Sequence, residues 1–209
     1  MAGTRTTELE AINTMLSAVG EPPINSLEDQ NNMDAAIAQN ILTEVSREVQ
    51  AHGWHFNSQR NVTFSPDDST KFITLPESVL RIDIEYWTSS SGTGITDDRD
   101  ITQRGSRLFD KKDNTYEFTK DVKASVIYGL DWADLPEPAR RYVAVRGARI
   151  FQDRMVGSQA HHAFSQEDEV RALALLKEFE GDTADHSIFG SYDIFRIVSR
   201  GDTVWRGTV

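Results

Sequence analysis

The chain has 209 residues, of which 38% are hydrophobic and 9% aromatic, which is enough for one domain with a modest core. It contains no cysteine, so disulfides and thiolate metal sites are excluded, and its formal net charge of −11 disfavours nucleic-acid binding, which needs clustered lysine and arginine. Two interpretations of this charge remain: ordinary solubility, or a surface such as the wall of a DNA channel that must not hold DNA.

The N-terminal segment predicts a short amphipathic helix and no signal peptide. Residues 1–10 have no apolar core segment, and no run in the chain approaches the roughly 18 apolar residues of a membrane span. Thr7 and Glu10 have the spacing of a capping box, and apolar residues then follow at helical intervals up to Val19.

Sharp stops end this helix and the next one. Gly20 can adopt the left-handed conformation after a helix, and Pro22 and Pro23 prevent the helix from resuming. A longer helix is predicted from the apolar residues at every fourth position of 37–49, and Gly53 ends it. We expect both stops to be structural, with two aromatic residues packed where the second helix meets the next region. The residues of this structural motif are Gly20, Pro22, Pro23, Gly53, Trp54 and Phe56.

Residues 54–130 predict a small antiparallel β region. Apolar and charged side chains alternate over residues 80–86, which is typical of a strand with one buried face. A hairpin is predicted around a turn at 110–114, between strands at 108–109 and 116–118. Further short strands are expected at 62–64, 72–75 and 123–128.

Helical periodicity returns after the β region. Pro136 and Pro138 suit the first turn of a third helix, which Gly157 ends, and a fourth, acidic helix continues to Gly181. These elements predict an α+β fold, a four-helix core with an inserted small antiparallel β region and an extended C-terminal tail. The two helical halves can form one bundle only if the β region leaves and re-enters the core at neighbouring points. The predicted parts are 1–53 and 131–181 for the helical core, 54–130 for the β region and 182–209 for the tail.

The third helix is the most basic segment of the chain. Its arginines are Arg140, Arg141, Arg146, Arg149 and Arg154. One interpretation is contact with DNA or an acidic partner, and the other is ion pairing with the acidic fourth helix or a neighbouring subunit. Because the chain is acidic overall, we favour pairing over DNA binding.

The tail has isolated aromatic residues but no periodicity and too little apolar content to form its own core. One interpretation is a frayed terminus. The favoured one is a docking element, in which aromatic anchors bury themselves in a partner and two arginines pair with acidic neighbours. The candidate docking residues are Phe189, Tyr192, Phe195, Arg196, Arg200 and Trp205.

The sequence shows no catalytic or metal-binding motif. It has no His-Glu-x-x-His pair, no Walker A loop and no Gly-x-Ser-x-Gly elbow, and its five histidines lack ligand spacing. No cofactor is therefore expected. A glycosidase needs only two facing carboxylates about 5–10 Å apart, so the acidic clusters keep that activity open as an alternative. These clusters lie at 67–68, 97–100 and 167–169.

Several segments resemble tail tubular protein A, the adaptor or gatekeeper of short-tailed bacteriophages. They are the Met-Leu-Ser-Ala-Val-Gly-Glu-Pro-Pro segment at 15–23 and the Gln-Ala-His-Gly-Trp-His-Phe-Asn segment at 50–57. The resemblance returns in Asp-Trp-Ala-Asp-Leu-Pro-Glu at 131–137 and in the pattern at 149–157, and it covers most of 6–181. The combination of Gly-Glu-Pro-Pro with Gly-Trp-x-Phe-Asn at this distance is the specific part.

The resemblance implies a structural protein and not an enzyme. It implies a dodecameric ring in the virion, between the portal protein and the tail nozzle protein, that extends the DNA ejection channel. Tail fibres would attach near the nozzle, and DNA would pass without specific binding. Two other functions remain open: a virion-associated polysaccharide hydrolase, in the same protein or in place of the connector, and a host-interaction module unrelated to phage tails.

Overall fold

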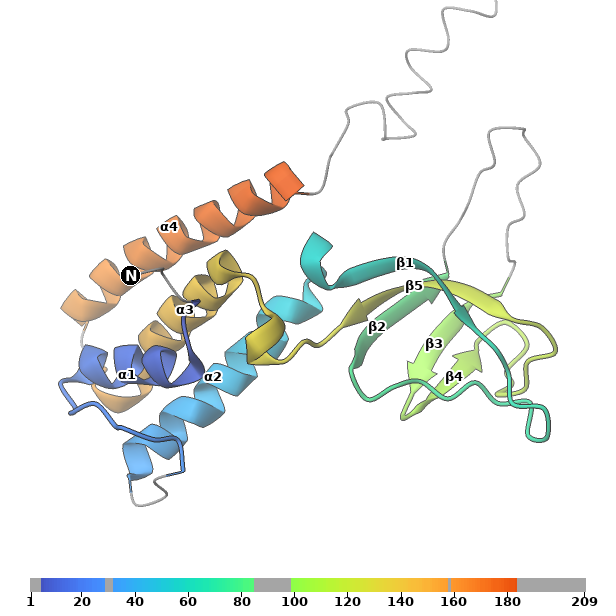
Figure 1. The fold of residues 1–209 in the computed structure, drawn as a ribbon, viewed down its shortest axis with the longest axis horizontal. Helices are drawn as coiled ribbons and strands as arrows, with labels where there is room; N and C mark the ends of the chain where they lie inside the picture. The colour runs from blue at the N-terminus through green and yellow to red at the C-terminus, as the bar shows by residue number, and fades with distance from the viewer. Residues whose placement is uncertain (1–4, 29–31, 85–98, 158, 184–209) are drawn as a thin grey trace, which may run out of the picture.

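The structure is a computed structural model that describes residues 5–28, 32–84, 99–157 and 159–183. Helices gather at one end of an elongated molecule and strands at the other (Figure 1). The described part thus has four α-helices and two small antiparallel sheets, which confirms the predicted α+β fold. No helix within it is long and apolar enough to cross a membrane.

The helical end is organised around α3. Helix α3 (Glu137–Met155) contacts α1 (Glu8–Val19), α2 (Met33–Ala51) and α4 (Gln159–Thr183). The core between them is built from the apolar faces that the periodicity indicated, because residues three and four apart share a helix face. Its fully buried large side chains are Ile12, Met15, Leu16, Leu42, Val45, Phe151 and Leu176.

The stop after α1 has the expected geometry. Thr7 and Glu10 form a capping box, and these hydrogen bonds hold the pKa of the Glu10 carboxyl below its ordinary value. Gly20 adopts the left-handed conformation with φ +84°. The Asn13 side chain then donates to the Ile24 carbonyl at 3.0 Å and accepts from its amide at 2.8 Å. The exposed Pro22–Pro23 turn is therefore fixed to α1 at both ends.

The larger sheet has the order β1–β5–β2, and all its pairs are antiparallel. Strands β1 (Ser58–Phe64) and β5 (Val122–Tyr128) pair Ser58 with Ile127, so the chain leaves and re-enters the helical end at adjacent positions. That meets the condition for joining the helical halves into one core. The predicted domain bounds, 1–53, 54–130, 131–181 and 182–209, stay predictions.

The predicted turn at 110–114 is present, closed by an antiparallel bridge between Asp110 and Thr115, but residues 116–118 form no strand beside 108–109. Strand β4 (Arg107–Asp110) pairs with β3 (Ile101–Arg104) before it, through a turn at Gly105, and with β2 (Val79–Ile84) these strands enclose a second core. The Asp110 carboxylate is buried and accepts from the amides of Lys112 and Asp113. The turn that follows is consequently closed by its own side chain, and the segment after it makes only isolated bridges.

Helix α4 also differs from the expectation. It continues through Gly181 to Thr183, whose hydroxyl donates to the Phe179 carbonyl at 2.7 Å. Glycine only weakens a helix, so its presence does not have to end one.

Candidate functional site

The chain crosses between the helical end and the β end twice, and both crossings lie side by side (Figure 1). The first follows α2 through Gly53, which has φ +84°. A side chain at this position would run into the Ile127 side chain of β5, so glycine is required for space as well as conformation.

Two aromatic residues of the predicted motif lie at this first crossing. The Trp54 ring is buried, its indole Nε1 donates to the Val49 carbonyl at 2.7 Å, and the His52 ring lies 5.0 Å away. Phe56 is partly buried against the helical core, within the short 3₁₀ helix η1 (His55–Asn57). Their positions are those of packing residues at the junction.

The buried amide of Gln50 connects α2 to the second crossing. Its Nε2 donates to the Leu130 carbonyl at 3.1 Å and to the Ser46 hydroxyl at 3.0 Å. Its Oε1 accepts from the Leu130 amide at 2.6 Å. One side chain therefore satisfies both backbone groups of Leu130, as a neighbouring strand would.

Asn57, at the first crossing, also joins α2 to the second crossing through hydrogen bonds. It is buried, and its Oδ1 accepts from the Trp54 amide at 2.8 Å. Its Nδ2 donates to the carbonyls of Gln50 at 2.9 Å and Tyr128 at 2.7 Å. Gln50 and Asn57, here called the amide clasp, tie the end of α2 to both crossings. These hydrogen bonds join the helical end to the β end at the junction.

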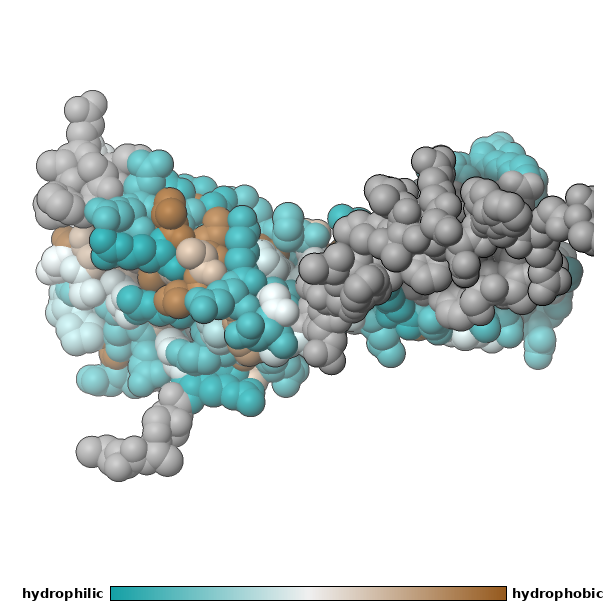
Figure 2. All heavy atoms as spheres, turned by 90° about the horizontal axis from the view of Figure 1, so that it is seen from above, coloured by the Kyte–Doolittle hydropathy of each residue, from teal (hydrophilic) through white to brown (hydrophobic). Residues whose placement is uncertain are grey.

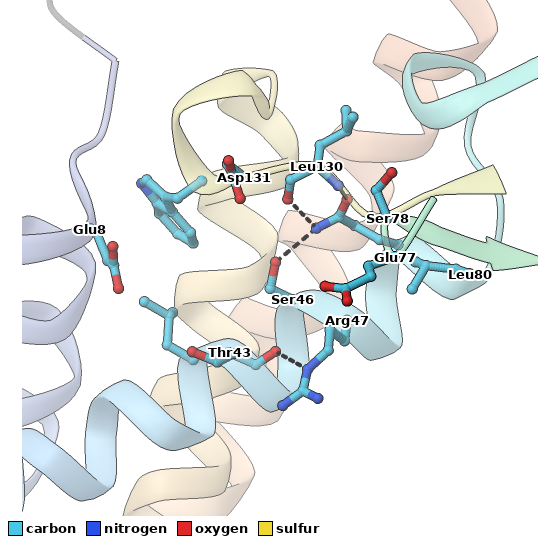
Figure 3. A pocket seen from close by; sticks show the side chains of 13 residues that line it. Glu8, Thr43, Ser46, Arg47, Glu77, Ser78, Leu80, Leu130 and Asp131 are labelled. Atoms are coloured by element: carbon cyan, nitrogen blue, oxygen red, sulfur yellow. Dashed lines mark hydrogen bonds between the residues drawn. The ribbon is translucent and has the colours of Figure 1, made fainter. Parts of the chain in front are cut away.

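A groove of about 350 Å³ opens beside the amide clasp (Figure 3). Carboxylates of Glu8, Glu77 and Asp131 line it from three different parts of the chain, together with the guanidinium of Arg47. The Arg47 Nε donates to the Thr43 carbonyl at 3.4 Å. No cluster of potential metal ligands occurs in the described ranges, this groove included.

The basic face of α3 is paired with acidic neighbours. Arg146 bridges Glu169 of α4 at 2.7 Å and Glu48 of α2 at 2.6 Å, and Arg149 donates to the same Glu169. Burial by itself lowers the pKa of Arg146, but the hydrogen bond to Glu169 and the nearby charges raise it overall. Arg146, Arg149 and Glu169, here called the arginine clasp, hold α4 on α3. The pairing predicted for this helix is therefore present within the chain.

Arg140 and Arg154 are also engaged. The buried Arg140 guanidinium donates to three backbone carbonyls, those of Leu135 at 2.9 Å, Thr6 at 2.9 Å and Ala133 at 2.6 Å. Arg154 pairs with Glu44 at 3.2 Å and holds the pKa of that carboxyl below its ordinary value. Arg141 is exposed on the surface of α3.

Helix α4 leaves much of its surface open. It packs chiefly on α3, and the buried positions described along it are Glu169, Ala172 and Leu176. Val170 is 61% exposed and Leu175 58% exposed, on opposite flanks of the helix, because five residues correspond to about 140° of rotation. Apolar residues also show on the surface of the helical end in Figure 2. Singly exposed aliphatic side chains are common on protein surfaces, so these two residues alone do not define a contact site.

Comparison with known proteins gives this geometry a context. A family model described as tail tubular protein matches residues 9–186. The chain belongs to the tail tubular protein family. Tail tubular protein A of Klebsiella phage KP34 is similar to it, with 28% identity over 173 residues that cover 82% of this chain and 86% of the relative.

Family membership identifies a structural component of a bacteriophage tail, carried in the virion. This agrees with the prediction that the chain is not an enzyme. The hydrolase alternative gains no support: Asp67 accepts from Ser69 and Thr70 within its own turn, which lowers its pKa, and Glu169 serves the arginine clasp.

The predicted docking residues lie outside the described residues. They are Phe189, Tyr192, Phe195, Arg196, Arg200 and Trp205, and each also lies beyond the end of the family match at residue 186. Their role stays a prediction. Sequence reasoning missed the amide clasp. Its only local signal is a glutamine on the buried row of α2, next to Val49.

Proposed function

We propose that this tail tubular family member is the adaptor of a short-tailed phage, with twelve copies forming a ring between the portal protein and the tail nozzle protein. The ring would extend the DNA ejection channel and help to anchor tail fibres. The observation that carries this proposal is the family match over residues 9–186, nearly the whole described chain. Synthesis in the host cytoplasm, before assembly into the virion, belongs to the same proposal.

The charge arrangement supports passage of DNA without binding. Double-stranded DNA carries one negative charge per roughly 1.7 Å of its axis, so a wall with free arginines would slow its passage. Arg140, Arg146 and Arg149 are held by carbonyls or carboxylates of the same chain. With a net charge of −11, the subunit offers DNA no basic stripe from α3.

Two surfaces suit the contacts of an assembled ring. The open surface of α4 suits a neighbouring subunit, because the exposed Val170 side chain would be buried in such a contact. The tail after α4 suits docking onto the portal protein through its aromatic anchors. The β end then extends away from the helical end towards the next part of the tail (Figure 1).

The test compares the full chain with a variant truncated after Thr183, where α4 ends. We expect the full chain to form or join rings in native mass spectrometry and to bind purified portal protein. The truncated chain should keep its helical circular dichroism and lose portal binding. A full chain that neither forms a ring nor joins one on the portal contradicts the adaptor proposal. Full portal binding by the truncated chain contradicts the docking role of the tail.

A further inference from the structure

Two arginines face each other at the end of the β3–β4 hairpin. Arg104 and Arg107 are direct partners in the strand register, on either side of the turn at Gly105. Directly opposite like charges destabilise a strand pair. Both side chains are exposed. This pairing makes the hairpin end an unfavourable place for two cations unless something compensates for it.

Aromatic rings support both guanidinium groups. The Arg104 Cζ lies 3.6 Å from the ring centroid of Phe109, and the Arg107 Cζ lies 4.6 Å from that of Phe72. The Tyr116 ring meets Phe109 and Phe72 edge to face, at centroid distances of 4.8 and 6.4 Å. These five residues are here called the cation–aromatic platform. Stacking on a ring fixes a guanidinium plane while its N–H edges stay free.

Neither arginine of the platform has a carboxylate partner within the described ranges. In the helical end, by contrast, Arg146, Arg149 and Arg154 each pair with a glutamate. A purely structural role would be served by such a pair. The free N–H edges of the platform instead match the geometry of a carboxylate, which accepts two parallel hydrogen bonds from one guanidinium.

We propose that the cation–aromatic platform binds a carboxylate-bearing segment of another protein. Two adjacent guanidinium groups suit one or two acidic side chains. DNA is the poorer fit, because phosphate binding needs a longer basic patch and the subunit as a whole is acidic. The platform lies in the β end, away from α1 and α4 (Figure 1). That the partner is a tail protein rests on the proposed function, whereas the carboxylate chemistry does not.

The test is an NMR titration of the full chain labelled with ¹⁵N-arginine, which detects weak binding at the individual Nε–H groups. The probe is a synthetic peptide with four glutamates separated by glycines. The comparison probes are the same peptide with glutamine in place of glutamate and a short DNA duplex. The platform variant is Arg104→Gln/Arg107→Gln. The matched control is Lys120→Gln/Lys123→Gln, which removes the same charge from exposed positions of the same region.

We expect the glutamate peptide to shift the Nε–H signals of Arg104 and Arg107, and the glutamine peptide to leave them unchanged. Affinity should fall about tenfold or more in the platform variant and less than about twofold in the lysine control. Both variants should keep the circular dichroism spectrum of the parent, which shows that they fold. No shift at the two arginines, equal losses in both variants, or tighter binding of the DNA duplex would each overturn the proposal.

Native mass spectrometry of the same samples separates this result from the adaptor proposal. If the chain binds the glutamate peptide but forms no ring, the platform proposal is supported and the adaptor proposal is contradicted. If the chain forms a ring on the portal but binds no peptide, the adaptor proposal is supported and the platform proposal is contradicted.

Discussion

The helical end and the β end of this molecule each hold a pair of arginines, and the two pairs are held in opposite ways. In the helical end, Arg140 donates to backbone carbonyls and Arg146 pairs with carboxylates of the same chain. In the β end, Arg104 and Arg107 rest on aromatic rings with their N–H edges free. A guanidinium whose N–H groups bond to the same chain holds helices together. A guanidinium whose N–H groups are free is available to a partner. Charge counting along the sequence does not distinguish the two cases.

The largest expected effect concerns the junction between the two ends. Trp54→Ala removes a buried indole and its hydrogen bond to the Val49 carbonyl. We predict a loss of about 3–5 kcal/mol in the free energy of unfolding, because truncating a buried aromatic side chain leaves a cavity. Urea denaturation followed by circular dichroism measures it. Unchanged stability together with lost partner binding would show that Trp54 belongs to an interface.

Breaking the arginine clasp should cost less. Glu169→Gln removes the charge that two guanidinium groups share, and both are only partly exposed. We predict a loss of about 2–3 kcal/mol, below the range for fully buried pairs. The control is Glu167→Gln on the same helix, whose pair with Arg171 is exposed and should be worth less than about 1 kcal/mol. Equal effects of the two substitutions in thermal unfolding contradict a structural role for the clasp.

The amide clasp should give the next effect. Gln50→Ala leaves the amide and carbonyl of Leu130 without their side-chain partner, which we expect to cost about 1–2 kcal/mol. Gln39→Ala is the matched control, since Gln39 lies on the same helix with one long contact of 3.5 Å to Glu8. Hydrogen exchange at the Leu130 amide should speed up in the Gln50 variant alone. Equal exchange rates at the Leu130 amide in both variants would contradict a role of the amide clasp at the junction.

The smallest effect is a pH dependence confined to the helical end. The folded-state pKa of Glu10 is lowered by its hydrogen bonds to Thr7, so its contribution is fully present above pH 4.5. That contribution is lost as the pH falls through the lower folded pKa. The difference in melting temperature between the parent and Glu10→Gln should therefore shrink on acidification. A difference that stays constant from pH 7 to about pH 3 contradicts the capping box as its source.

Local features of this fold could be predicted from sequence, and long-range ones could not. The Thr7 cap and the Gly20 stop depend on neighbours within a few residues, so the local sequence predicts them. The amide clasp joins Gln50 to Leu130, far along the chain. A glutamine on the buried row of a helix does not indicate which residue it contacts. The turn at 110–114 is predicted correctly, but the strand partner of 108–109 is the segment before it and not the one after it.

The candidate sites divide in the same way. Pairing of the basic helix with the acidic one follows from their opposite charges, although the particular partners of Arg146 do not. The cation–aromatic platform assembles residues from three separate segments, among them Phe72, Arg104 and Tyr116. Its existence depends on strand register, which single-sequence patterns leave open.

Electron cryomicroscopy of the full chain bound to its portal protein tests the central claim most directly. We predict a twelve-subunit ring whose lumen is neutral or negative, with Arg140, Arg146 and Arg149 kept in their contacts within each subunit. Absence of a ring, or a ring whose lumen is lined by these three arginines, would contradict it.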